Sequence, residues 1–333
     1  MAEIHVTKDC KLIKVLADQS QGKCTDGIAM SEAQDIVKEL ANSNTAQHRD
    51  ELAAIMSYTV TDLQKHELDF LNNIADQKNI NYNDKAVFNV RNNNGIKVIM
   101  QAKGGSTVPR SYVGERQITV DTNEIAARPA INLYDLRLGR VNMADLIAEA
   151  NRLMTLKKLE AVELALQGAI STYASPFYAT GTGINKGLLD AQLTYFRRIG
   201  PVNVLGDIAA VSQLAPIVGM AMNSTTNQFS GNQIDELNDN GFIGRYNGCP
   251  VVCLANAYED GKTTPVLKDN WLYLIPGGLS ADARNLKLVN EGPVSAFPAQ
   301  DINDMVFEVR LDQSFGCAFV TAHNPTLGAY CIN

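Results

Sequence analysis

The chain has 333 residues, of which 45% are hydrophobic, and a formal net charge of −7. This length allows one large domain or two to three smaller ones, with enough apolar residues for a substantial core. The first thirty residues contain no apolar run that could act as a signal peptide. The longest apolar stretch, residues 202–222, is interrupted by Asp207, Gln213 and Pro216, so it cannot span a bilayer. We expect a protein made in a cytoplasm, with no membrane partner.

The charge is unevenly distributed along the chain. Residues 1–84 carry a net charge of −6, residues 85–142 carry +5, and the remainder carries −6. One interpretation is an uneven, solvated surface. The other is a positive arm that lies on a negative neighbour, where complementary charge sets register and partner choice. Nucleic-acid binding is less favoured because the overall balance is acidic and would repel phosphate.

Helical periodicity dominates the N-terminal quarter. Ser31 and Gln34 match a capping box, and apolar residues recur at helical spacing as far as Leu40. A second amphipathic run covers residues 52–74 and ends in an asparagine-rich stretch at 79–83. Each run has a single apolar stripe and no obvious partner in the neighbouring sequence. We therefore predict a narrow helical arm that packs on another copy of the chain.

The next segment has the composition of β-structure. Residues 96–100 and 117–120 are rich in β-branched residues, and the residues between them include Gly104, Gly105 and Pro109. This pattern predicts a long two-stranded hairpin with a flexible tip. An isolated hairpin is only marginally stable in water, so this one needs a surface on which to lie.

The strongest helix signal follows the hairpin. Asn142 is a suitable N-cap, and one face stays apolar from Met143 to Ile170, ending before Ser175. This is roughly 30 residues, or about 45 Å at 1.5 Å per residue. Beyond it, helices are expected at 188–196 and from Asp207. Strands are expected at 202–205, 250–254, 271–275, 305–311 and 315–322.

Motifs for chemistry are weak. Gly261-Lys262-Thr263 resembles the end of a P-loop, but the required first glycine is replaced by Asn256. Gly181, Gly183 and Gly187 miss the dinucleotide fingerprint by one residue. The six cysteines and four histidines match no zinc spacing and no CxxC pair, which indicates buried, reduced thiols. We expect no catalytic, cofactor-binding or metal-binding residues, and no enzyme.

The order of these elements resembles that of the major capsid protein of tailed bacteriophages, the Hong Kong 97 (HK97) fold of the α+β class. Four passages carry the resemblance: residues 131–136, 248–252, 307–312 and 315–320. The resemblance implies an N-terminal helical arm at 1–84, an extended hairpin loop (E-loop) at 85–142 and a peripheral domain with a spine helix at 143–200. It further implies a mixed α/β axial domain at 201–299 and a return to the peripheral domain at 300–333.

The resemblance also implies a function. Copies of the chain would assemble as hexamers and pentamers into an icosahedral head around double-stranded DNA, which is enclosed without sequence-specific binding. Further partners would be scaffold, portal and decoration proteins. We expect no N-terminal scaffolding segment to be removed from this chain, and therefore a separate scaffold or none. Assembly would occur in the host bacterial cytoplasm, and the product would be the virion capsid.

The candidate inter-subunit contacts lie on the predicted hairpin. They are Lys97, Lys103, Gly104, Gly105, Arg110 and Arg116. Lys103 occupies the position at which some relatives crosslink a lysine to an asparagine, but no partner can be chosen, so no crosslink is predicted. Two alternatives remain open at this point: an encapsulin-type compartment that encloses enzymes, and a cytosolic α/β enzyme of unknown reaction.

Overall fold

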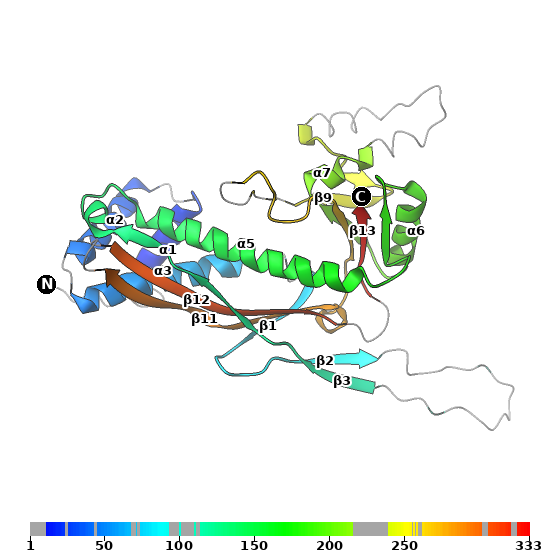
Figure 1. The fold of residues 1–333 in the computed structure, drawn as a ribbon, viewed down its shortest axis with the longest axis horizontal. Helices are drawn as coiled ribbons and strands as arrows, with labels where there is room; N and C mark the ends of the chain where they lie inside the picture. Colours follow the sequence, from blue (N-terminus) through cyan, green and yellow to red (C-terminus); the bar gives the residue numbers. More distant parts are fainter. Residues whose placement is uncertain are drawn as a thin grey trace.

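A computed structural model describes residues 11–23, 26–42, 45–67, 71, 74–92, 100, 110, 114–215, 239–254, 256, 258, 262–301, 306–320 and 325–333. The chain forms two lobes connected by one long helix (Figure 1). The helices are α1 (Lys11–Ser20), α2 (Gly27–Asn42), α3 (Ala46–Glu67), α4 (Leu133–Arg137), α5 (Met143–Ile170), α6 (Lys186–Arg197), α7 (Ile208–Val211) and a 3₁₀ turn at Ala281–Ala283.

The strands form two sheets and a separate hairpin. The five-stranded sheet contains β1 (Ala75–Ile80), β4 (Asn123–Ala127), β5 (Ala130–Asn132), β11 (Leu286–Asp301) and β12 (Val306–Phe319). The six-stranded sheet contains β6 (Tyr178–Gly181), β7 (Val202–Gly206), β8 (Arg245–Tyr246), β9 (Cys249–Cys253), β10 (Trp271–Pro276) and β13 (Gly328–Ile332). The hairpin consists of β2 (Val87–Asn92) and β3 (Gly114–Thr119).

Helix α5 confirms the strongest helix prediction. It has 28 residues, and the Asn142 side chain accepts a hydrogen bond from the backbone N–H of Ala144 at its start. Its first half packs in the core of the first lobe, through residues such as Ile147 and Met154. Its last turns, with Leu166 and Ile170, pack in a core of the second lobe. The helix therefore belongs to both lobes (Figure 1).

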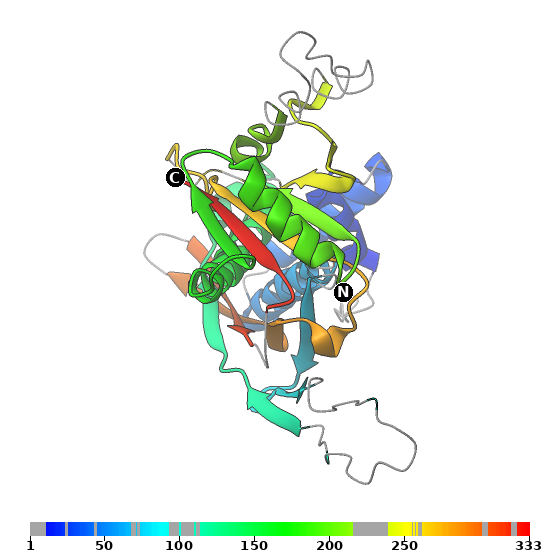
Figure 2. The ribbon, with the colours of Figure 1, turned by 90° about the vertical axis from the view of Figure 1, so that its right-hand side faces the viewer.

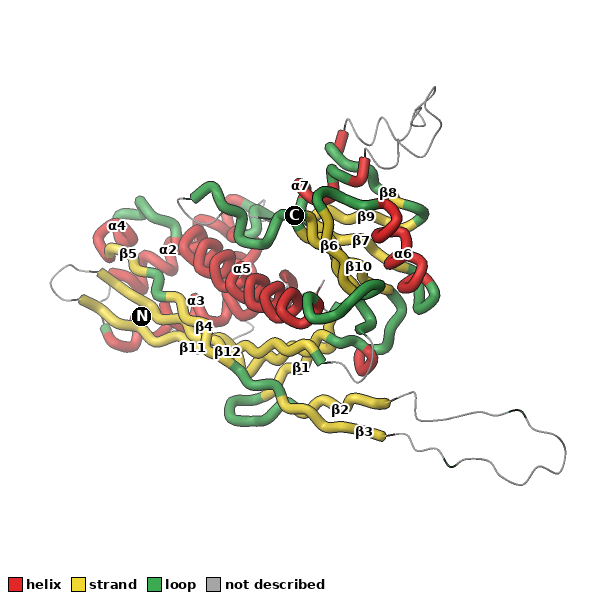
Figure 3. The backbone as a smooth tube through the Cα atoms, turned by 45° about the vertical axis from the view of Figure 1, so that its right-hand side comes forward, coloured by secondary structure: helices red, strands yellow, loops and turns green. Residues whose placement is uncertain are grey.

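The first lobe is a layer of helices on a long, twisted sheet (Figure 3). Strands β11 and β12 are 16 and 14 residues long and run antiparallel to each other. Strand β1 joins β11 in parallel, whereas β4 and β5 both pair with β12 in antiparallel. Apolar residues of β11 and β12, including Val294, Phe307 and Leu311, pack against the helices.

The N-terminal helices correct one prediction. We expected residues 1–84 to form an arm without a partner in its own chain. Instead, the buried faces of α1, α2 and α3 share one core with α5, β11 and β12; Leu16, Val37 and Ile55 are each at most 3% exposed there. The apolar stripes were correctly recognised, but they pack against one another and against α5, β11 and β12, which lie much later in the sequence. The predicted cap is also wrong, because α2 begins at Gly27 and Asp26 accepts the hydrogen bonds at its start.

The second lobe is a six-stranded sheet covered on both faces (Figure 2). Its strand order is β6-β13-β10-β7-β9-β8. Leu272 and Leu274 of β10 face the core that contains α6, whereas Trp271, Tyr273 and Ile275 face the end of α5. Side chains alternate between the two faces of a strand, so β10 is buried on both.

Several strands differ from the predictions. Strands at 202–205, 250–254 and 271–275 are confirmed as β7, β9 and β10. The two C-terminal strands expected at 305–311 and 315–322 form one continuous strand, β12. Strands β1, β6, β11 and β13 were not predicted. In β11, Gly292, Pro293 and Pro298 resemble a loop in sequence, but a bulge between Glu291 and Ser295 accommodates Gly292 and Pro293, and Pro298 lies in register opposite Val309.

The sheets also cross an expected domain boundary. We expected residues 201–299 in one domain and 300–333 in another. Strand β11 pairs with β12 in the first lobe, whereas β13 pairs with β6 and β10 in the second. The chain therefore returns to the first lobe before residue 299 and enters the second lobe again at its C-terminus. The names peripheral and axial domain remain predictions.

A buried lysine lies at the centre of the first lobe. The Lys158 side chain on α5 is 1% exposed, and its Nζ donates hydrogen bonds to Gln64 Oε1 on α3 at 2.8 Å and to Gln313 Oε1 on β12 at 2.5 Å. Its ammonium lies 5.6 Å from the centre of the Phe315 ring. One charged group thus connects α3, α5 and β12 where the sequence alone indicates an apolar helix face.

Replacing Lys158 with alanine should lower the free energy of unfolding by about 2–4 kcal/mol, because it removes buried contacts and leaves polar groups unpaired. Urea unfolding of the unassembled subunit measures this change. The control is Lys157→Ala, which removes an exposed lysine paired with Glu160 on the same helix and should change it by less than about 1 kcal/mol. Equal effects of the two substitutions would contradict the role of Lys158.

Candidate assembly surface

The predicted contact residues lie on and around the β2–β3 hairpin. Lys97, Lys103, Gly104 and Gly105 lie outside the described residues. Arg110 and Arg116 are described, and both are exposed. The first predicted strand, 96–100, also lies outside the described part apart from Met100, and the described strand that pairs with β3 is β2. The alternation of Ala86, Phe88 and Val90 is a signal that could have identified β2.

The hairpin leaves the first lobe beside β1 and β11 (Figures 1 and 3). All residues of β3 except Ile118 are exposed, and Val87 and Asn89 on β2 are exposed as well. Val90 is directly opposite Arg116 in the antiparallel register. The described part of the hairpin therefore presents polar and charged side chains to its surroundings, with a cation on β3.

The root of the hairpin has a small core of its own. Phe88 is 1% exposed and packs with Ala86, Val120 and Val289. Two lysine ammonium groups approach its ring: Lys78 Nζ at 4.8 Å and Lys287 Nζ at 5.5 Å from the ring centre. Local sequence patterns do not reveal this anchor, because its partners come from β11 and from the segment after β3.

The lysine beneath Phe88 is held by a buried ion pair. Lys287 on β11 and Asp76 on β1 are direct partners in the parallel register, and Lys287 Nζ lies 2.8 Å from Asp76 Oδ2. The Lys287 side chain is 1% exposed. Its Nζ also donates to the backbone carbonyl of Asp282 at 3.1 Å. These partners satisfy a buried cation that would otherwise be strongly unfavourable.

Both ends of the hairpin are held by one carboxylate. Glu291 Oε1 accepts a hydrogen bond from the backbone N–H of Asn83, before β2, at 2.8 Å. Glu291 Oε2 accepts one from the Thr122 hydroxyl, after β3, at 2.7 Å. These two bonds, the Thr122 bond first, lower the pKa of the Glu291 carboxyl below its ordinary value. We call Glu291, Asn83 and Thr122 the hairpin clamp.

The turn before β2 fits closely over the β11 bulge. The Tyr82 hydroxyl donates to the Pro293 carbonyl and lies 2.7 Å from the Ser295 hydroxyl. Gly292 has φ of +69°, and a Cβ there would lie 2.4 Å from a Tyr82 ring atom. Glycine is therefore required at this position both for its backbone conformation and for the tyrosine ring.

No group of three metal-ligating side chains occurs among the residues that the structure describes. Within the same residues, no helix has the length and apolar composition needed to cross a membrane.

Known structures share this architecture. The chain is similar to a structure from Mycobacterium phage Cain (12% identity, TM-score 0.51, covering 79% of this chain and 90% of that one). It is also similar to a structure from Mycobacterium phage Bobi (13%, 0.50, 78% and 89%) and to the capsid structure of the cyanophage P-SCSP1u (7%, 0.50, 79% and 88%). At these identities the likeness shows the fold alone: that of phage capsid proteins, the HK97-like fold.

The family is shown by sequence. Residues 6–330 match the family model described as "SPbeta prophage-derived putative capsid protein YonB". The chain therefore belongs to this family of phage capsid proteins. The search of curated protein sequences gives no match.

The hairpin clamp gives a test of how the hairpin is held. Replacing Glu291 with alanine should speed hydrogen exchange at the Asn83 amide roughly 5- to 30-fold, because that N–H loses its acceptor. Acid should remove the same protection, so that the exchange rate of Glu291→Ala divided by that of wild type falls toward one, although amide exchange itself slows as the pH falls. A carboxyl with a lowered pKa stabilises the folded form fully above its ordinary pKa and loses the effect as the pH falls through its lowered pKa.

Exchange monitored by NMR or mass spectrometry, with wild type and variant compared at each pH, measures both effects. The two proteins should converge below the ordinary pKa range of a glutamate. Glu124→Ala is the control, because Glu124 is an exposed carboxylate of the same sheet whose ion pair is with Arg310 on β12, away from the hairpin clamp. Unchanged exchange at Asn83 in Glu291→Ala would refute the clamp.

Proposed function

We propose that this protein is the major shell subunit of a tailed-phage head. Copies assemble as hexamers and pentamers into an icosahedral shell around double-stranded DNA. The observation that carries this proposal is the family match over residues 6–330, together with a capsid-type fold across both lobes. The role is structural and not enzymatic.

The hairpin is the part of the molecule best suited to contact a neighbouring subunit. Its root is fixed by the Phe88 core and the hairpin clamp, whereas β3 is exposed along nearly its whole length. A segment that is firmly held at its base can contact a neighbour without unfolding its own lobe. The net charge of +5 over residues 85–142 favours an acidic surface on that neighbour.

Other partners follow from the same proposal. Shell assembly in the host cytoplasm would involve a portal and, where needed, scaffold and decoration proteins, and the finished location is the virion. The enclosed DNA needs no sequence-specific contacts, and the acidic balance of the chain opposes tight binding to phosphate.

Electron microscopy of the expressed protein tests shell formation directly. We expect closed, uniform icosahedral particles with hexameric and pentameric units. A small discrete oligomer under all assembly conditions, including coexpression with the other head proteins of its prophage, would overturn the proposal. Particles that contain an enzyme cargo in place of DNA would identify an encapsulin-type compartment.

Reversing four hairpin charges tests the acidic-neighbour contact. The variant carries Lys97→Glu, Lys103→Glu, Arg110→Glu and Arg116→Glu, and we expect it to block assembly or to make assembly strongly dependent on salt. The matched control exchanges lysine and arginine at the same four positions and keeps the charge. Particle yield is measured at low and high salt. Normal yields of the reversed variant at both salt concentrations would contradict the contact.

A further inference from the structure

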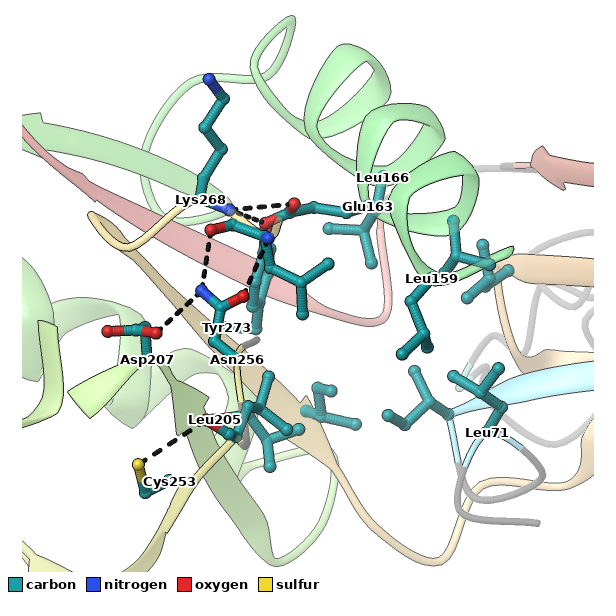
Figure 4. A pocket seen from close by; sticks show the side chains of 16 residues that line it. Leu71, Leu159, Glu163, Leu166, Leu205, Asp207, Cys253, Asn256, Lys268 and Tyr273 are labelled. Atoms are coloured by element: carbon teal, nitrogen blue, oxygen red, sulfur yellow. Dashed lines mark hydrogen bonds between the residues drawn. The ribbon is translucent and has the colours of Figure 1, made fainter. Parts of the chain in front are cut away.

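An apolar cavity lies between α5 and the six-stranded sheet, where the two lobes meet (Figure 4). Its volume is about 310 Å³, which is within the range of small-molecule sites. Described side chains from five elements and from the segments between them line it. Those that define its walls are Leu159, Val162 and Leu166 from α5, Leu205 from β7, Ile275 from β10 and Leu286 from β11.

The polar groups at the edge of the cavity already have protein partners. Glu163 Oε1 accepts hydrogen bonds from the Tyr273 hydroxyl at 3.0 Å and from Gln167 Nε2 at 2.9 Å, and both Glu163 oxygens accept from the backbone N–H of Lys268 at 3.1 Å. Burial is the main cause that raises the pKa of the Glu163 carboxyl, which indicates a poorly hydrated environment.

A second polar group closes another side of the cavity. Asn256 Nδ2 donates to Asp207 Oδ2 and to the Leu267 carbonyl, both at 2.8 Å, and its Oδ1 accepts from the Leu267 N–H at 2.9 Å. The other oxygen of Asp207 accepts from the Ala209 N–H at the start of α7. None of these edge groups needs a ligand or a water molecule to complete its hydrogen bonding.

Apolar walls, together with edge groups that already have hydrogen-bond partners, favour an apolar occupant over water. A buried water typically makes about three hydrogen bonds to polar groups that lack other partners, and an enclosed apolar cavity of about 150 Å³ stays dry and binds small hydrophobic molecules. The charged groups around the cavity also favour a neutral ligand over an anionic one. The carboxylates of Glu163 and Asp207 border the cavity, whereas the Lys268 side chain points away from it (Figure 4). An anionic ligand would therefore meet repulsion without a compensating cation.

We propose that this inter-lobe cavity is a binding site for one small, neutral, apolar molecule. The site is separate from the assembly surface at the hairpin and does not depend on the proposed function. A ligand there would contact α5 and the six-stranded sheet together, so it should stabilise the junction of the two lobes, by an amount that grows with the logarithm of the free ligand concentration above Kd.

Fluorescence titration with two dyes that share one ring skeleton tests the site. N-phenyl-1-naphthylamine is neutral, and 8-anilino-1-naphthalenesulfonate adds a sulfonate. At pH 8 we expect the neutral dye to bind saturably at one molecule per chain and to raise the melting temperature. The sulfonated dye should bind at least about tenfold more weakly, because two carboxylates border the cavity and the ammonium of Lys268, the cation among the described lining residues, points away from it.

Two substitutions on the same helix locate the binding. Leu159→Phe places a larger side chain in the cavity and should weaken binding of the neutral dye by about tenfold or more. Leu164→Phe makes the same change at a position that is 73% exposed and does not line the cavity, so its affinity should equal that of wild type. Circular dichroism verifies that both variants fold.

If Leu159→Phe does not fold, Leu205→Phe fills the cavity from the opposite wall and serves the same purpose. The proposal is overturned by binding that does not saturate, by equal affinity for the two dyes, or by affinity that a folded cavity-filling variant leaves unchanged. Each of these results can occur whether or not the protein assembles into shells, so failure here is distinguishable from failure of the proposed function.

Discussion

The arrangement of the whole molecule depends on α5 packing in the cores of both lobes. Its N-terminal half is buried among α1–α3 and the long strands β11 and β12, and its last turns are buried against β10. A helix of 28 residues gains most of its stability from such packing and not from intrinsic propensity. Because the same rigid element is fixed in both cores, it sets the position of one lobe relative to the other.

The polar interactions of α5 complement this apolar packing. Lys158 connects α5 to α3 and β12 in the first lobe, while Glu163 connects it to β10 and to the segment before β10 in the second. The two side chains lie about one and a half turns apart on the helix. Between the helix and the second sheet remains the apolar cavity, so the junction combines directional hydrogen bonds with incomplete packing.

The hairpin illustrates how a capsid-type subunit can present an extended segment without losing its own stability. Lys287 and Asp76 are buried beneath Phe88, and the clamp at Glu291 holds the chain on both sides of the hairpin. The strands beyond this root expose polar side chains. Folding of the root and contact with a neighbour can therefore be separate events, which suits a protein that must fold first and assemble later.

The sequence alone determined those elements whose signals are local. The Asn142 cap and the unbroken apolar face defined α5, short apolar runs defined β7, β9 and β10, and the order of elements indicated the capsid fold. Tertiary structure decided what the N-terminal helices cover, since a stripe of apolar residues does not identify its partner. It also decided the parallel pairing of β1 with β11, the return of β13 to the second lobe, and the positions of Glu291 and Lys158. These features join residues far apart in the chain, and no local pattern of side chains encodes such contacts.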